Sequence, residues 1–222
     1  LLRKYAITRW ELFIHRFSFV QCKKLLKYSA MTLASGVAVP VTHLVIRNYL
    51  GENLGWDKAG YWQAIWYIST MYLTVVTTAL GVYYLPRLSE ITDKNELRRE
   101  LSKGYKVIMP IVIVMALTIF FLRDFVVWML FDSSFTPMLE LFAWQLVGDV
   151  VKIAAWLLAY LMLAKAMTLP FILTELISSF VFVVLSVVFV KIYGLVGITY
   201  AFTLNYIVYF CILYFPVRRR LL

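Results

Sequence analysis

The sequence predicts an all-α, polytopic membrane protein with six transmembrane helices. Of its 222 residues, 63% are hydrophobic and the mean hydropathy is +0.81, whereas soluble domains are about 45–50% apolar. Continuous apolar runs recur along the chain, each long enough to cross a hydrocarbon core of ~30 Å as a helix. The basic residues alternate between the two ends of successive runs, which supports an even number of crossings.

Six apolar runs define the expected spans. We place them at residues 25–50, 59–85, 105–122, 138–164, 171–192 and 195–217. Residues 1–24 are expected to form a basic interfacial leader and residues 218–222 a basic tail. The apolar piece 125–131 is too short to cross, so it should lie at an interface or prolong the third helix. The turns "KAMTLP" and "YGLVG" make the last three spans antiparallel neighbours.

The basic residues set the expected orientation. Seventeen of the 22 Lys and Arg residues fall on the side of the leader, four fall on the other side, and Lys152 lies inside the fourth span. The positive-inside rule therefore places both termini of this chain in the cytoplasm. Topology explains most of the net charge of +10, and no nucleic-acid role is expected. Basic side chains at the interface can also touch anionic lipids.

The first span carries a polar face. Its polar and small residues recur in steps of three or four, which keeps them on one side of a helix; they are Ser29, Thr32, Gly36, Pro40, His43 and Arg47. Pro40 removes a backbone hydrogen bond and should act as a hinge. The freed carbonyl oxygen then needs a partner, which water in a cavity can supply.

The second span has a similar stripe, which includes Thr70 and Thr74. Close helix packing and the lining of a cavity explain this stripe equally well. Trp56, Tyr61, Trp62 and Trp66 gather at its outer end. We interpret them as an interfacial aromatic belt, with a sugar-stacking surface as the alternative.

The fourth span contains an acidic and a basic residue, Asp149 and Lys152, inside an otherwise apolar run. Gln145, Asp149, Lys152 and Trp156 share one face, at steps of four, three and four. Lys152 lies roughly 16 Å into the helix, close to the bilayer midplane. Ionised groups at that depth are costly and mark functional sites. Asp149 and Lys152 either neutralise one another in a helix bundle or belong to a water-lined site, together with Glu175 of the fifth span.

The sequence lacks the residue patterns that nucleotide-binding, zinc and other metal sites require. No Walker A sequence, GxGxxG loop or HExxH pair occurs, and the two cysteines and two histidines are not spaced for metal. We therefore expect no cofactor, no metal and no enzymatic activity.

Short motifs spread over nearly the whole chain resemble a known family. They are "GYWQ", "YLPRLSEIT", "LRDF", "FAWQLVGDVVK", "AKA" and "YIVYF", in that order, and the fourth is the most specific. The chain resembles the carboxy-terminal half of Wzx-type lipid-linked oligosaccharide flippases in the MOP superfamily, and most of all those that move lipid III of enterobacterial common antigen.

The resemblance implies a twelve-helix transporter in which this chain is the second six-helix lobe. The chain begins with Leu1 rather than Met, and we expect an amino-terminal lobe upstream of it. The implied substrate is a glycan linked to undecaprenyl pyrophosphate, moved outward by alternating access across the bacterial inner membrane for enterobacterial common antigen or O-antigen. Polysaccharide polymerase and chain-length machinery are possible partners. Arg47, Asp149, Lys152, Lys165 and Glu175 fall where the family has similar residue types, whereas His43 does not obviously match.

The residues suggest how such a transporter would work. Arg47 and Lys152 would meet the pyrophosphate, while Gln145, Thr70, Thr74, His43 and Asp149 would line a wet cavity. Asp149 or Glu175 would titrate if an ion gradient drives transport. A multidrug or small-molecule antiporter of the same superfamily is the first rival reading. A non-transporting membrane scaffold of polysaccharide assembly is the second.

Overall fold

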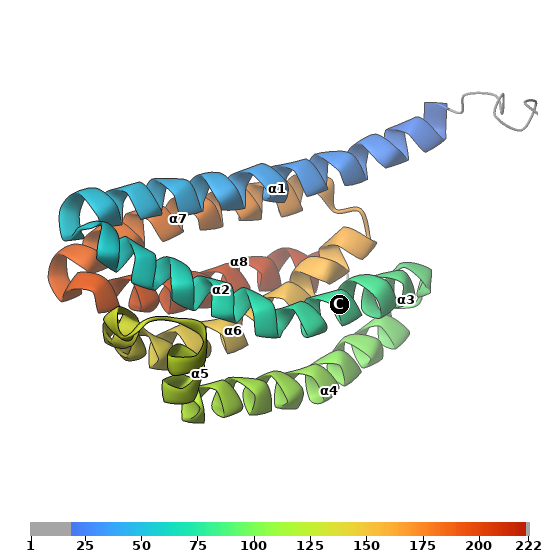
Figure 1. Ribbon diagram of the computed structural model, residues 1–222. Coiled ribbons are helices and arrows are strands. Elements are labelled where there is room, and N and C mark those ends of the chain that lie inside the picture. The colour runs from blue at the N-terminus through green and yellow to red at the C-terminus, as the bar shows by residue number, and fades with distance from the viewer. Residues whose placement is uncertain (1–18, 221–222) are drawn as a thin grey trace, which may run out of the picture.

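The computed structural model describes residues 19–220 (Figure 1). Its six long helices are α1 (Phe19–Leu54), α2 (Trp56–Ala79), α4 (Lys94–Phe121), α6 (Phe142–Ala164), α7 (Thr168–Tyr193) and α8 (Gly197–Arg220). They are joined by the π-helix η3 (Leu80–Tyr84), the helices α3 (Leu85–Glu90) and α5 (Arg123–Leu130), and the 3₁₀ segments η4 (Ser133–Leu141) and η5 (Gly194–Val196). Residues 1–18 of the predicted leader and 221–222 of the tail lie outside the described range.

The long helices match the predicted fold class. Within the described range, 5 stretches are long and apolar enough to cross a membrane. The last, Thr168–Arg219, has 52 residues, which would be about 78 Å as one helix, far more than a bilayer core. It contains α7 and α8, which fold back and pack on one another, so it makes two crossings. The predicted all-α class with six long apolar helices is confirmed.

Local sequence determines where the helices begin and end. Gly55, with φ of 100°, separates α1 from α2, and Gly194, with φ of 64°, separates α7 from α8; glycine adopts such angles without a Cβ clash. The carboxylate of Asp93 caps α4 by accepting a hydrogen bond from the Glu96 amide at 2.8 Å. The wide turn of η3 precedes Pro86, whose ring would clash with the carbonyl four residues earlier in a regular α-helix.

The short apolar piece after α4 forms a separate helix. The backbone leaves the helical conformation at Leu122, and α5 then turns across the end of α4 (Figure 1). It therefore does not prolong the third long helix. The following 3₁₀ segment contains Pro137, and α6 begins after it at Phe142.

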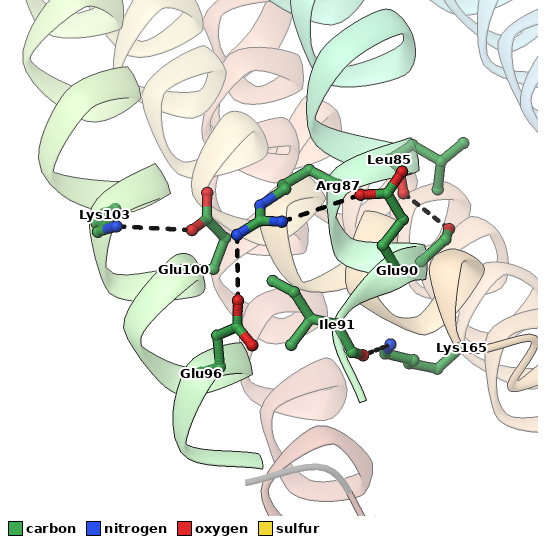
Figure 2. A network of polar contacts seen from close by, with 9 residues as sticks. Leu85, Arg87, Glu90, Ile91, Glu96, Glu100, Lys103 and Lys165 are labelled. Carbon is green, nitrogen blue, oxygen red and sulfur yellow. Dashed lines mark hydrogen bonds and ion pairs between the residues drawn. The ribbon is translucent and has the colours of Figure 1, made fainter. Parts of the chain in front are cut away.

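A polar network ties together the turns at one end of the bundle (Figure 2). The guanidinium of Arg87 in α3 pairs with Glu90 at 3.9 Å and with Glu96 of α4 at 3.1 Å. Lys165, which follows α6, donates a hydrogen bond to the carbonyl oxygen of Ile91. The network thus joins the α3–α4 turn to the end of α6.

Helix α6 is the centre of the bundle. It packs against α8, α4, α3 and α2, while α7 packs between α1 and α8. Most of its residues are buried, including Gln145, Asp149 and Lys152. A helix with neighbours on several sides has no single lipid-facing or cavity-facing surface, so its polar residues can contact different neighbours.

Two hydrophobic clusters fill the bundle, and α6 contributes to both. One contains Phe142 and Leu146 of α6 together with Ile65 and Phe202. The other contains α6 residues from Ile153 onward together with parts of α2, α4 and α8. Asp149 and Lys152 lie on α6 between the residues that this helix adds to the two clusters, so the buried charges form a layer between them.

Candidate functional site

A cavity of about 570 Å³ lies between α1, α2, α6, α7 and α8. Its wall includes Thr32, Gly36, Pro40 and His43 of α1, Trp66 and Thr70 of α2, Lys152 and Trp156 of α6, Glu175 and Ser178 of α7, and Phe202, Asn205, Tyr206 and Tyr209 of α8. The cavity therefore combines one lysine, one carboxylate, several hydroxyl and amide groups, and aromatic rings. A volume in this range is typical of pockets that bind small ligands.

Lys152 faces aromatic rings rather than an acid. Its Nζ lies 4.9 Å from the ring centre of Trp156, 5.9 Å from that of Phe202 and 5.8 Å from that of Tyr206. Ammonium groups within about 6 Å of a ring face are attracted by its quadrupole. Three rings thus surround the charge at the cavity wall without neutralising it.

Asp149 and Gln145 turn away from the cavity and meet α2. Tyr72 donates a hydrogen bond from its hydroxyl to Asp149 Oδ2 at 2.9 Å. Gln145 Nε2 donates to Ser69 Oγ at 3.3 Å. Both α6 side chains are fully buried, and neither lines the cavity. The face predicted from spacing is therefore divided: Gln145 and Asp149 bind α2, whereas Lys152 and Trp156 face the cavity.

No salt bridge joins the acid and the base in the described part of the chain. The ion pairs found there involve residues of α3, α4 and the start of α5 instead. Asp149 Oδ1 is buried and has no hydrogen-bond partner within residues 19–220. The acid and the base therefore attract one another through space without a direct salt bridge.

Glu175 stands on the opposite wall of the cavity. Its Oε1 accepts a hydrogen bond from the hydroxyl of Tyr209 on α8. Next to it, Asn205 Nδ2 donates to Ser178 Oγ at 3.1 Å. These contacts tie α7 to α8 and place a carboxylate, an amide and hydroxyl groups on one side of the cavity.

His43 packs among aromatic rings at the cavity wall. Its ring is stacked on Trp62 with 5.2 Å between centroids, and lies tilted against Trp66 at 4.5 Å. Its Nδ1 is buried without a hydrogen-bond partner in the described range. Trp62 is 1% exposed, so it packs inside the bundle and does not face an interface, as the interfacial-belt interpretation required. The half-buried ring of His43 stacks on it.

Three predicted residues differ in how they relate to this cavity. Pro40 lines it, and α1 continues through Pro40 as one helix. Thr74 donates to the Thr70 carbonyl oxygen at 2.6 Å and is not part of the wall. Arg47 is exposed on α1 one turn beyond His43 and is also not part of the wall. The residues of the predicted set that the cavity gathers are Lys152, His43, Thr70, Glu175 and Pro40.

Spacing alone missed the contribution of α8. Phe202, Tyr206 and Tyr209 lie in a continuous apolar run and look like ordinary core residues in the sequence. Asn205 was the available signal, since an amide inside such a run marks a buried polar contact. Within the described residues, no three His, Cys, Asp or Glu side chains come together as metal ligands would.

Comparison with solved structures defines the class of fold. The chain superposes on the Vibrio cholerae MATE transporter VcmN in its bent form with a TM-score of 0.75 and 18% identity, covering 89% of this chain and 46% of that one. A mutant of the same transporter gives a TM-score of 0.73 at 17% identity, with the same coverage. The chain therefore has the all-α fold of about half of a MATE transporter.

Sequence comparison identifies the family. The sequence model of a family described as polysaccharide biosynthesis protein matches residues 3–140, which is more than half of the chain. The chain therefore belongs to that family, and it is a multi-pass membrane protein. It is 38% identical over 200 residues to the lipid III flippases of Escherichia coli and Shigella flexneri, covering 89% of this chain and 48% of each flippase. The chain spans about half the length of these curated relatives.

Proposed function

We propose that this chain is half of a transporter that moves undecaprenyl-pyrophosphate-linked oligosaccharide across the bacterial inner membrane. The observation that carries the proposal is Lys152, a lysine at the wall of a cavity among membrane-spanning helices, with no salt-bridge partner in the described residues. A pyrophosphate entering an apolar bundle needs such a cation. The similarity to two lipid III flippases points to the same class of substrate.

The cavity suits the two polar parts of such a substrate. Lys152 would bind the pyrophosphate, while Thr70, Ser178 and Asn205 would offer hydrogen bonds to sugar hydroxyls. Trp66 adds an aromatic surface against which a sugar ring can pack. The polyprenyl tail needs no polar cavity and would stay in the bilayer. Arg47, exposed on α1 beyond His43, would supply a second cation outside the cavity.

A second six-helix lobe would complete the transporter. Because the chain spans about half of its relatives, we propose that it works with an amino-terminal lobe and that α1 bends at Pro40 during alternating access. The distribution of Lys and Arg supports cytoplasmic termini for this chain in the inner membrane. Polysaccharide polymerase and chain-length machinery are the proposed partners in assembling enterobacterial common antigen or O-antigen.

Energy coupling would involve a carboxylate, and Glu175 is the better placed candidate. It lines the cavity, whereas Asp149 is fully buried outside it. Glu175→Gln keeps the side-chain shape and removes the titratable group. We expect it to slow transport driven by an ion gradient and to leave substrate binding intact, as measured in vesicles with and without an imposed gradient.

Complementation tests the proposed transport. In a bacterium that lacks its lipid-linked oligosaccharide flippase, the full-length protein should restore surface polysaccharide, and Lys152→Ala and Arg47→Ala should not. Lys191→Ala, which removes an exposed cation at the end of α7, is the matched control and should complement normally. Complementation by the Lys152 and Arg47 variants at normal expression would overturn the assignment.

Thiol labelling separates a transporter from a scaffold. In a background without Cys22 and Cys211, cysteines at cavity positions Thr32 and Ser178 should react with a membrane-impermeant maleimide, because water reaches the cavity of a transporter. A cysteine at buried Thr199 on α8 should stay unreactive. Protection at all three positions would favour the scaffold reading. Drug resistance without polysaccharide rescue would favour a multidrug antiporter.

A further inference from the structure

Helix α6 carries an acid and a base that should attract one another. Residues three apart on a helix are neighbours on its surface, and two opposite charges attract strongly in a medium of low dielectric constant. Even so, Lys152 lines the cavity and Asp149 does not. Something on a neighbouring element must therefore hold the carboxylate away from the ammonium.

Tyr72 of α2 holds one oxygen of this carboxylate, beside Ser69 and Gln145, which also interact with Asp149. Its hydroxyl donates to Asp149 Oδ2 at 2.9 Å, while Asp149 Oδ1 has no hydrogen-bond partner in residues 19–220. Tyr72 is not part of the cavity wall, so it would not touch a ligand there. Lys152, which makes no direct salt bridge with the acid in the described residues, rests against Trp156, Phe202 and Tyr206.

We propose that Tyr72 is a positioning residue that keeps Asp149 on the α2 side and so leaves Lys152 free to bind a pyrophosphate. The inference rests on the proposed function, because it assumes that Lys152 meets an anionic ligand. A lysine already paired with Asp149 would have to break that pair before binding the ligand. A lysine that rests against aromatic rings has no salt bridge to break before it meets the ligand.

A purely structural role for the Tyr72–Asp149 contact makes a different prediction. If the contact only ties α2 to α6, removing the tyrosine hydroxyl and removing the carboxylate would both loosen the bundle, and neither would repair the other. If Tyr72 restrains the acid, removing the carboxylate should repair the loss of the hydroxyl. A double-mutant cycle between the two residues distinguishes these roles.

The experiment measures binding of farnesyl pyrophosphate to the purified full-length protein by calorimetry. Tyr72→Phe should weaken binding about tenfold, the effect of a charge-assisted contact, because Asp149 is then free to pair with Lys152. Asp149→Asn alone should bind at least as tightly as wild type. The Tyr72→Phe, Asp149→Asn double variant should return to within about twofold of wild type. Where Asn does not fold, Asp149→Ala removes the same carboxylate.

Two controls make the result specific. Tyr105→Phe removes another tyrosine hydroxyl that bonds α6, at the Ala154 carbonyl oxygen 2.7 Å away, and should bind like wild type. Lys152→Ala should abolish binding. Unchanged binding by Tyr72→Phe, or a double variant no better than Tyr72→Phe, overturns the positioning role while Lys152-dependent binding stands. Equal binding by wild type and Lys152→Ala, or none by wild type, overturns the proposed function and this inference with it.

Discussion

Replacing Gly148 by alanine should loosen the contact between α6 and α8 and disturb the cavity together. Gly148 is buried on α6 next to Phe202 and Thr203 of α8. A Cβ built there would lie 2.7 Å from Phe202 Cε1 and 3.0 Å from Thr203 Oγ1, whereas carbon atoms pack at about 3.5–4.0 Å. Thr203 cannot easily move, because its hydroxyl donates to the Trp144 carbonyl oxygen at 2.7 Å. The Phe202 ring must therefore shift by roughly 1 Å.

The size of the effect follows from two opposing terms. Overpacking a well-filled site destabilises by about 1–3 kcal/mol, and alanine in a helix interior regains about 1 kcal/mol over glycine. The net loss of about 0–2 kcal/mol corresponds to a fall of up to about 8 °C in the unfolding midpoint of a chain this long. Because Phe202 also lies against Lys152, binding of farnesyl pyrophosphate should weaken in the same variant.

Thermal unfolding in detergent checks the stability part, with Gly60→Ala as the matched control. Gly60 is also inside a helix, but nothing lies within 4 Å of the position of its Cβ, so alanine should be neutral or slightly stabilising there. A Gly148→Ala midpoint equal to or above that of Gly60→Ala would refute the close approach of α8. A lowered midpoint with unchanged binding would refute the link between Phe202 and the cavity.

Three further predictions concern the turns between helices and the half-buried His43. Gly197→Ala should lower the unfolding free energy by at least about 3 kcal/mol, because its Cβ would meet the backbone of Phe189 and Val190. Gly194→Ala has free space around its Cβ but a φ of 64°, so it should lower the unfolding free energy by about 1–3 kcal/mol through backbone strain. A smaller loss for Gly197→Ala than for Gly194→Ala would contradict the α7–α8 packing. Arg87→Ala should change stability by less than about 1 kcal/mol because its ion pairs are solvent-exposed. Lys165→Met should lower stability by about 1–3 kcal/mol, because it leaves the Ile91 carbonyl oxygen without its donor. Chemical unfolding compares the two variants, and a larger loss for Arg87→Ala would show that the exposed ion pairs contribute more than the Lys165 hydrogen bond. His43→Phe should stabilise by up to about 1 kcal/mol in a thermal scan, since Nδ1 is buried without a partner in the described residues, and a lower midpoint would mean that the nitrogen has one.

The number and type of the long helices could be predicted because they depend on local composition. Each apolar run is bounded by charged residues or by glycine, and these signals do not require knowledge of the neighbours. The break at Gly194 is an example: the apolar character continues through it, and the positive φ that glycine permits makes the chain turn back. Edges were less predictable, as at η4, where a 3₁₀ segment containing Pro137 precedes α6.

The use of the polar face on α6 could not be predicted from spacing. Steps of three and four place Gln145, Asp149 and Lys152 within one arc of the helix, but the arc of a central helix faces more than one neighbour. In the bundle α2 meets the first two residues and the cavity meets the third. Tyr72 is 77 residues away from Asp149 in the sequence, and nothing near either residue indicates the contact.

The aromatic surroundings of Lys152 also explain why a lysine is tolerated at this depth without a salt bridge. Placing an ionised lysine at the centre of a membrane costs about 2.5–3.5 kcal/mol on insertion scales. A desolvated cation–π contact returns about 2 kcal/mol, and Trp156, Phe202 and Tyr206 all lie within range of Nζ. The rings therefore offset most of the cost while the charge stays available. An ion pair with Asp149 would offset it as well, but it would leave less attraction for a ligand. If Lys152 binds the proposed anionic substrate, this arrangement favours anion binding over maximal stability, and it depends on aromatic residues of α8 that look like ordinary core in the sequence.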